Sequence, residues 1–246
     1  MTRPATNFAT VLASRLARLA AERDIALARL IAAACDHGIA TLVQVGSLGR
    51  GQGDSWSDLD LIAVPIDSYT VDDICAAAFG DQIVATITVP RNAPTGGDYQ
   101  AVCLKTTDGI VWIDLYIWPR HTACVPEDGK VVFDHIGLAS SPQPFADLLT
   151  THTDPTRPKH PDSGATTLLR VCVAAKYLAR GDHARARAKL PQAAGLPIRL
   201  IPARLHALLG AVTEPDLAPA VMAAGKLVDL AASCGSTPAA DARCHA

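Results

Sequence analysis

Aromatic side chains are scarce in this chain, and the common metal and membrane signatures are missing. Aromatics make up 4% of the 246 residues, so a nucleic-acid surface that stacks bases on interleaved rings is not expected. The sequence holds no Cys-x-x-Cys, His-x-x-x-His or His-Glu-x-x-His pattern, which removes the usual zinc motifs. No uninterrupted apolar run approaches the roughly 20 residues that span a bilayer. We therefore expect neither a zinc site nor a membrane span.

Cysteine usage and overall composition point to a globular protein of the cytoplasm. The seven cysteines are odd in number and scattered, so a disulfide framework is not expected and reduced thiols are. Apolar residues make up 49% of the chain and charged residues 19%, which is typical of a folded domain rather than a disordered one. The length suits one large domain or two of ordinary size.

The net charge of −2 hides an uneven distribution along the chain. Residues 1–150 carry 10 basic and 17 acidic side chains, whereas residues 151–246 carry 12 and 7. An acidic half that binds metal, opposite a basic half, would suit a polyanionic nucleotide between them. Solvated helix surfaces explain the same asymmetry equally well.

The pattern of apolar residues changes near residue 141. Before it, we expect a helix over 7–37, with a break near Arg23-Asp24 left open, and a second helix over 71–79. Strand-like segments in the same half lie at 41–46, 57–64, 82–90, 99–119 (as a hairpin) and 131–135. After residue 141 the sequence predicts helices near 142–151, 164–181, 183–190, 201–211 and 216–234.

These segments predict an α+β fold in two parts. The first part is a domain over 1–140, with a short mixed sheet and flanking helices, and the second is a helical domain over 141–236. The bridge at 151–164 has three prolines and is the expected linker. The last residues, 237–246, are expected to form a disordered tail.

One stretch concentrates residues suited to chemistry, namely VQVGSLGRGQGDSWSDLDLIAV at 43–64. A glycine-rich turn at Gly46-Ser47 lies between two apolar runs, and the second run carries Asp58 and Asp60. Alternate residues of a strand share a face at a repeat of roughly 6.6–7 Å, so both carboxylates are expected to project together. Adjacent carboxylates beside a turn rich in N–H groups suit a divalent cation that carries a polyphosphate.

A third carboxylate is expected on a neighbouring strand, and Asp114 in IVWIDLYIW is the candidate. An unpaired carboxylate in so apolar a segment costs several kcal/mol. A cation would neutralise it and explain its position. The alternative is a salt bridge to Arg50, Lys105 or Arg120.

The segment GSLGRGQGDSWSDLDL, with a strand on each side and a later apolar strand holding one Asp, resembles the nucleotidyltransferase superfamily that includes DNA polymerase beta. The shared pattern is Gly-Ser followed at a set distance by Asp-x-Asp. The closest likeness is to the aminoglycoside- and lincosamide-modifying enzymes and to the minimal nucleotidyltransferases. The resemblance covers roughly residues 40–118 and implies a nucleotidyltransferase catalytic domain in residues 1–140.

The resemblance implies roles for particular residues. Gly46 and Ser47 would form the phosphate-binding turn, and Asp58, Asp60 and Asp114 would hold two Mg²⁺ ions. Asp114 would either bridge the catalytic metal or take the proton from the attacking hydroxyl. Arg50 would either contact the triphosphate or remain solvated.

In the second half, LLRVCVAAKYLARGDHARARAKL at 168–190 resembles the helix pair with which the aminoglycoside and lincosamide enzymes close over the nucleotide. Lys176 or Arg170 would then contact the triphosphate, and their spacing of six places them on different helix faces, so only one is expected to do so. The candidates for binding a cationic acceptor are Glu127, Asp128, Asp134 and Asp182.

The resemblance implies an enzyme that transfers a nucleoside monophosphate, AMP from ATP, to a hydroxyl of a small molecule such as an aminoglycoside-like antibiotic, releasing pyrophosphate. Two alternatives stay open: transfer to a protein or tRNA, as in antitoxin-like minimal members, and a non-catalytic nucleotide-binding protein of the same fold. The basic segment at 180–189 lacks interleaved aromatics, so nucleic acid is not the expected partner. A homodimer also stays open.

Overall fold

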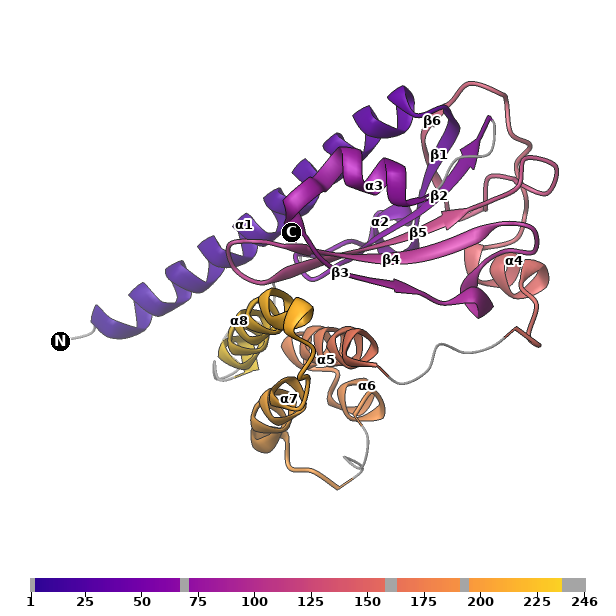
Figure 1. The fold of residues 1–246 in the computed structure, drawn as a ribbon. Helices are drawn as coiled ribbons and strands as arrows, with labels where there is room; N and C mark the ends of the chain where they lie inside the picture. Colours follow the sequence, from indigo (N-terminus) through magenta and orange to yellow (C-terminus); the bar gives the residue numbers. More distant parts are fainter. Residues whose placement is uncertain (1–2, 67–70, 158–162, 191–194, 236–246) are drawn as a thin grey trace. The chain divides into compact units, whose positions relative to one another are not determined.

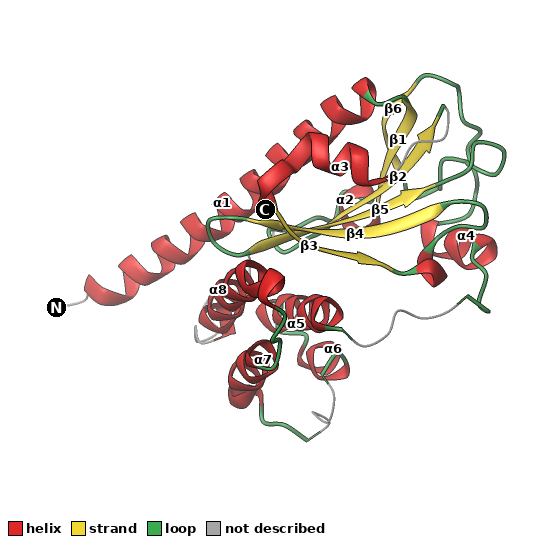
Figure 2. Ribbon diagram, in the orientation of Figure 1, coloured by secondary structure: helices red, strands yellow, loops and turns green. Residues whose placement is uncertain are grey.

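A computed structural model describes residues 3–66, 71–157, 163–190 and 195–235. Within these ranges the protein is α+β, with one six-stranded mixed sheet and eight α-helices (Figure 1, Figure 2). The chain divides into two compact units. The sheet unit comprises Glu22–Leu104 and Val111–Pro161, and the helical unit comprises Met1–Ala21, Lys105–Ile110 and Asp162–Ala246. The expected functional division at residue 140 stays a prediction, and the expected tail at 237–246 lies outside the described residues.

The sheet has the strand order β3-β4-β5-β2-β1-β6. Its strands are β1 (Ile39–Val45), β2 (Leu59–Pro65), β3 (Ile83–Thr88), β4 (Asp98–Lys105), β5 (Ile110–Ile117) and β6 (Lys130–Asp134). β1 pairs antiparallel with β2 and with β6, and β3 pairs antiparallel with β4. β2 and β5 run parallel. The hairpin expected over 99–119 is β4 and β5, and its turn is closed where the Thr106 N–H donates to the Gly109 carbonyl at 3.0 Å.

The two central strands bury one face against helices. Leu59 and Leu61 of β2 and Leu115 of β5 belong to a core shared with α1 (Arg3–Asp36) and α3 (Val71–Phe79). Figure 1 shows α3 and the later part of α1 on the same side of the sheet. Because successive strand residues point to opposite faces, Asp60 and Asp114 lie on the face turned away from this core.

Helix α1 runs without a break, so the break left open at Arg23-Asp24 does not occur. The Arg23 guanidinium donates to the Asp24 carboxylate at 3.0 and 3.1 Å and to the Asp54 carbonyl at 2.6 Å. Arg23 therefore binds a loop of the sheet unit, and the pair does not interrupt the helix. The helix stops before Gly38, whose φ of 71° suits glycine and ends helices.

One strand starts later than expected. The segment predicted as a strand over 57–64 forms β2 only from Leu59. The Ser57 N–H donates to the Asp54 carbonyl at 3.1 Å, which closes a turn just before the strand. Ser57 and Asp58 therefore precede β2, and the predicted strand start was wrong by two residues.

The helical unit is built on four helices that pack on one another: α5 (Gly164–Ala179), α6 (His183–Ala188), α7 (Ile201–Gly210) and α8 (Ala218–Gly235). Ser163 caps α5 by accepting the Thr166 N–H at 3.2 Å, and Asp182 caps α6 by accepting the Arg185 N–H at 3.1 Å. Such caps satisfy N–H groups that the helix itself leaves unpaired. The four helices confirm the expected α-helical character of the C-terminal part.

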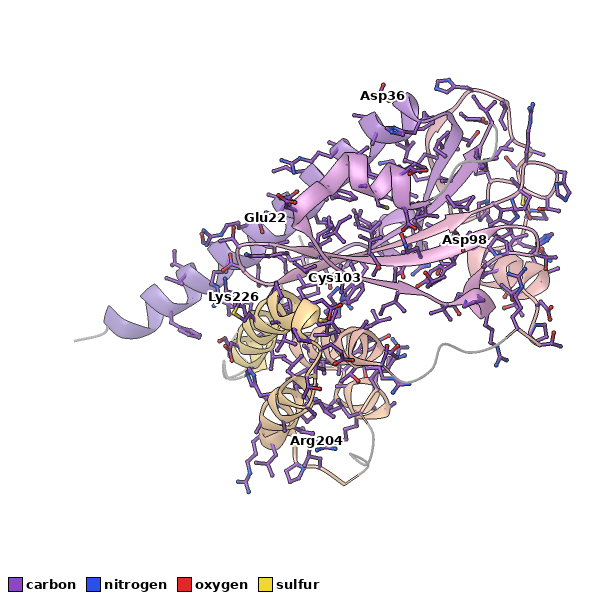
Figure 3. All side chains as sticks on the ribbon, viewed as in Figure 1. Glu22, Asp36, Asp98, Cys103, Arg204 and Lys226 are labelled. Atoms are coloured by element: carbon purple, nitrogen blue, oxygen red, sulfur yellow. The ribbon has the colours of Figure 1, made fainter. Side chains whose placement is uncertain are left out.

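The β4–β5 turn belongs to the helical unit and anchors the first part of α1 there. The buried Asp108 carboxylate accepts from the Nε groups of Arg15 and Arg18 at 2.8 and 2.7 Å. Lys226 of α8, labelled in Figure 3, donates to the Thr107 carbonyl at 3.3 Å. Three segments far apart in sequence are thus joined by hydrogen bonds.

The stretch Pro215–Cys234, which contains all of α8 but its last residue, is long and apolar enough to cross a membrane, with a mean hydropathy of 1.4. It is the one such helix in the described part of the chain. Buried core helices pass the same test, so the indication is weak. Leu227 and Leu230 of α8 are fully buried in the folded chain.

The hydrogen bond from Thr41 to Asp134 predicts that the stability of the fold depends on pH. Asp134 accepts from Thr41 Oγ1 at 2.7 Å and from three backbone N–H groups, and these donors, Thr41 first, lower the pKa of Asp134. A carboxylate with a lowered folded-state pKa stabilises the fold above its unfolded pKa, here 3.8, and this contribution disappears as pH falls through the folded value. We expect Thr41→Val to lower the free energy of unfolding at pH 7, with a smaller difference from wild type at about pH 3. Urea unfolding of both proteins at both pH values measures this, and equal differences would contradict it.

Candidate functional site

Asp60 and Asp114 lie side by side in the sheet. They are register partners on the parallel strands β2 and β5. Each is half-buried in a strand whose other residues are mostly buried. The expectation that Asp114 lies on a strand next to that of Asp60 is confirmed, whereas metal binding by the pair stays a prediction.

Two tyrosines adjoin this pair of carboxylates. Burial, followed by the negative charges of Asp114 and Asp60, raises the pKa of Tyr116 well above its usual range. The Tyr99 hydroxyl donates to Asp114 Oδ1 at 2.5 Å, and its pKa is likewise raised, by burial first and then by the Asp114 charge. Tyr99 directly follows Asp98, which Figure 3 labels on β4.

The aromatic rings form a continuous cluster beside the carboxylates. The ring centroids of Tyr99 and Tyr116 are 4.8 Å apart, and those of Tyr116 and Phe145 are 5.0 Å apart. Phe145 is the first residue of α4 (Phe145–His152). Side chains of low polarity raise the strength of electrostatic interactions near them, so charges brought to Asp60 and Asp114 act more strongly than they would in water.

The turn at Gly46 lies against Asp60. Gly46 has a φ of +68°, and a β-carbon added to it would fall 2.8 Å from Asp60 Cγ. Real β-carbons do not approach other atoms so closely, so this position requires glycine for its conformation and for the space. The glycine-rich turn and one of the two carboxylates are therefore immediate neighbours.

A chain of hydrogen bonds holds the serine of this turn. Ser47 Oγ donates to Ser57 Oγ at 3.0 Å, and Ser57 Oγ donates to Asp54 Oδ1 at 3.0 Å. The Asp54 N–H donates back to Ser57 Oγ, and the Asp54 carbonyl accepts from Arg23. The loop between the turn and β2 is thus fixed to α1 through buried and half-buried groups, and the Ser47 hydroxyl is oriented by it.

Asp58 differs from its predicted position. Asp58 precedes β2, which begins at Leu59, so the alternation of strand residues no longer argues for a shared face with Asp60, and the expectation that the two carboxylates project together stays a prediction. Asp58 is half-buried at the end of the loop. Among the described residues, no group of three or more His, Cys, Asp and Glu side chains is arranged to hold a metal ion. Of the three predicted ligands, the structure brings together Asp60 and Asp114.

Arg50 and Lys176, the other predicted nucleotide contacts, lie in different units. Arg50 follows α2 (Gly46–Gly49) and pairs with Asp128 Oδ2 at 3.2 Å, so its side chain, although 44% exposed, is bound to the protein surface. Lys176 lies on α5 in the helical unit and is 4% exposed. Arg170, its alternative on the same helix, is exposed.

Three of the four carboxylates expected to bind a cationic acceptor have structural roles. Asp128 accepts the Phe145 N–H at 2.6 Å at the start of α4, in addition to its pairing with Arg50. Asp134 accepts the N–H groups of the loop that follows β6, and Asp182 caps α6. Glu127 is exposed. The binding of a cationic acceptor by these four residues stays a prediction.

Sequence reasoning missed Tyr99, Asp54 and Arg23. Tyr99 could have been found from the hairpin, because a turn at 106–109 pairs residue 99 with residue 116 across antiparallel strands and places it diagonal to residue 114. The contacts of Arg23 and Asp54 join a helix to a loop 31 residues away, and nothing in their spacing indicates this.

No family model matches the chain, and no curated protein matches it. The nucleotidyltransferase resemblance therefore depends on the sequence motif.

The contact between Gly46 and Asp60 predicts a difference between two glycine substitutions. Gly46 and Gly51 have nearly the same φ, +68° and +69°, but a β-carbon at Gly51 would meet nothing within 4 Å. Gly51→Ala should cost only the left-handed backbone strain of about 1–2 kcal/mol. Gly46→Ala should cost more, because Asp60 must also move. Urea unfolding of both variants measures the difference, and equal costs would show that the Gly46 contact is unimportant.

Proposed function

We propose that this protein is a Mg²⁺-dependent nucleotidyltransferase that moves AMP from ATP to a hydroxyl group of a small molecule. The observation that carries the proposal is the pairing of Asp60 with Asp114 in register on parallel strands, directly beside the Gly46 turn. Asp60 is the second acid of the Asp-x-Asp motif, and Asp114 is the further acid expected on a neighbouring strand.

The donor set fits Mg²⁺. Asp60 and Asp114 offer carboxylate oxygens, the ligand type that this hard cation prefers. Two like charges on adjacent strands destabilise one another, so the site gains from a cation that neutralises both. Asp58, at the end of the loop before β2, is the further carboxylate that would complete the set.

Each residue of the site then has a separate task. Gly46 allows the backbone to approach the terminal phosphates of the nucleotide, and Ser47 offers its N–H to them. The Ser47 hydroxyl would donate to a phosphate only after giving up its bond to Ser57 Oγ. Asp60 and Asp114 would hold the cation. Asp114 would serve either as a metal ligand alone or also as the acceptor of the proton from the attacking hydroxyl. Neutralising the triphosphate and activating the attacking hydroxyl is the chemistry that bound Mg²⁺ supplies. The protein contributes position and charge rather than a covalent intermediate.

The reaction joins the acceptor oxygen to the α-phosphorus of ATP and breaks the bond to the β-phosphate oxygen, so that pyrophosphate leaves. An aminoglycoside-like antibiotic remains the proposed acceptor class, since the helical part resembles that of antibiotic-modifying enzymes. The reduced cysteines suit a cytoplasmic enzyme.

The direct test is pyrophosphate release from ATP and Mg²⁺ across a panel of aminoglycosides, lincosamides, tRNA and co-purified proteins. We expect Asp60→Asn and Asp114→Asn to reduce turnover at least about 100-fold, because each removes a metal ligand. Asp81→Asn is the matched control, since Asp81 is an exposed carboxylate after α3 and should keep the wild-type rate. Turnover only with tRNA or a protein would show that the acceptor is not a small molecule. Binding of ATP without any turnover would support a non-catalytic nucleotide-binding protein.

Stability should change in the opposite direction from activity. Without metal, Asp60→Asn removes one of two like charges on adjacent strands, which repel one another. We expect its free energy of unfolding, measured in urea with a chelator present, to equal or exceed that of wild type. A clear loss of stability would mean that Asp60 is a structural residue and would weaken its assignment as a metal ligand.

A further inference from the structure

We infer that Tyr99 is a positioning residue that fixes the Asp114 carboxylate for metal binding. The inference rests on the proposed function, because Asp114 is a metal ligand only if that proposal holds. It adds a residue that lies outside the Gly-Ser and Asp-x-Asp motif and acts through Asp114 rather than on the substrate.

The Tyr99 hydroxyl lies within a directed hydrogen-bond chain. The Asn92 side chain hydrogen-bonds the Tyr99 oxygen in the sense that lowers the tyrosine pKa, which is that of a donor. The phenol proton is then directed to Asp114 Oδ1, at 2.5 Å. The bond to Asp114 therefore uses the one proton of the Tyr99 hydroxyl.

The ring that carries this hydroxyl is buried and packed against neighbouring rings. Tyr99 is 3% exposed and contacts the Tyr116 ring, which in turn contacts Phe145 of α4. Asn92 ends a turn over Pro90–Asn92, which is held where Arg157 donates to the Pro90 carbonyl at 3.3 Å. The position of the hydroxyl is therefore determined by packing and by backbone on both sides.

A carboxylate on a strand can rotate about two side-chain bonds, and both rotations matter to a metal ligand. The bond from Tyr99 to Oδ1 selects one orientation of Asp114 beside Asp60, its register partner. Groups held in place before binding lose less conformational entropy when the ligand arrives. Loss of the Tyr99 hydroxyl should therefore weaken metal binding and slow turnover, while leaving contacts with the nucleotide base and sugar unchanged.

Tyr99→Phe tests the inference because it keeps the ring and removes only the hydroxyl. Mn²⁺, added to the full-length protein with and without ATP and followed by electron paramagnetic resonance, reports metal affinity without catalysis. We expect the Mn²⁺ dissociation constant to rise about tenfold, in the range for loss of a group that orients a ligand. The kcat should fall by a similar factor, with the KM for ATP changed less than about twofold. Asn92→Ala, an exposed change that preserves the fold, should give a smaller shift in the same direction.

Thr41→Val is the matched control, because it also removes a hydroxyl that donates to a carboxylate, Asp134. It should leave Mn²⁺ affinity and kcat unchanged despite its cost in stability. If Tyr99→Phe and Asn92→Ala bind Mn²⁺ as wild type does, with equal kcat, the inference is wrong while the proposed function stands. An effect of Thr41→Val as large as that of Tyr99→Phe also overturns it. If the wild-type protein neither binds Mn²⁺ nor turns over ATP, the proposed function fails, and the role of Tyr99 fails with it.

Discussion

The backbone pairing of β2 with β5 forces two negative charges together, and much of the surrounding structure serves that arrangement. Parallel strands in register place Asp60 and Asp114 at the same height on one face of the sheet. The strands that carry them are buried on the opposite face, so the backbone positions of both residues are fixed. Like charges held this close are unfavourable unless something offsets them. The hydrogen bond from Tyr99 stabilises one of the charges, and a bound cation would stabilise both.

The loop before β2 connects the Gly46 turn to helix α1 through hydrogen bonds. Ser47 is held by Ser57, Ser57 by Asp54, and Asp54 by Arg23 of α1. A glycine-rich loop alone would sample many conformations, since glycine gives up the most backbone freedom on ordering. The buried polar chain limits that freedom. Arg23, in the part of α1 between Glu22 and Asp36 that Figure 3 labels, thereby links the packing of the core to the shape of the turn.

The sequence was informative where a local rule applied and uninformative where long-range contacts decided. Alternating apolar residues predicted the strand around Asp114, and the Gly-Ser and Asp-x-Asp spacing predicted its neighbour. The same alternation started β2 two residues too early, because a hydrogen-bonded turn at Ser57 outweighed strand propensity at that end. Arg50 was expected at a nucleotide or in solvent, but it pairs with Asp128, a residue 78 positions away. Pairings over such distances depend on the folded topology, which residue spacing does not encode.

The helical unit is discontinuous in sequence, and this affects how the protein can form. Its members include residues 1–21, 105–110 and the chain from 162 onward. Arg15 and Arg18 are therefore synthesised long before their partner Asp108, and longer still before the helices of the same unit. Contacts between distant segments slow folding, because the loops between them must close first. The two stretches of chain that connect the three parts of the helical unit make up the sheet unit. We therefore expect the sheet unit to fold before the helical unit is complete. A cut between the sheet and the C-terminal helices would not release an intact domain, because the C-terminal fragment would lack the N-terminal helix segment and the hairpin turn of its own unit.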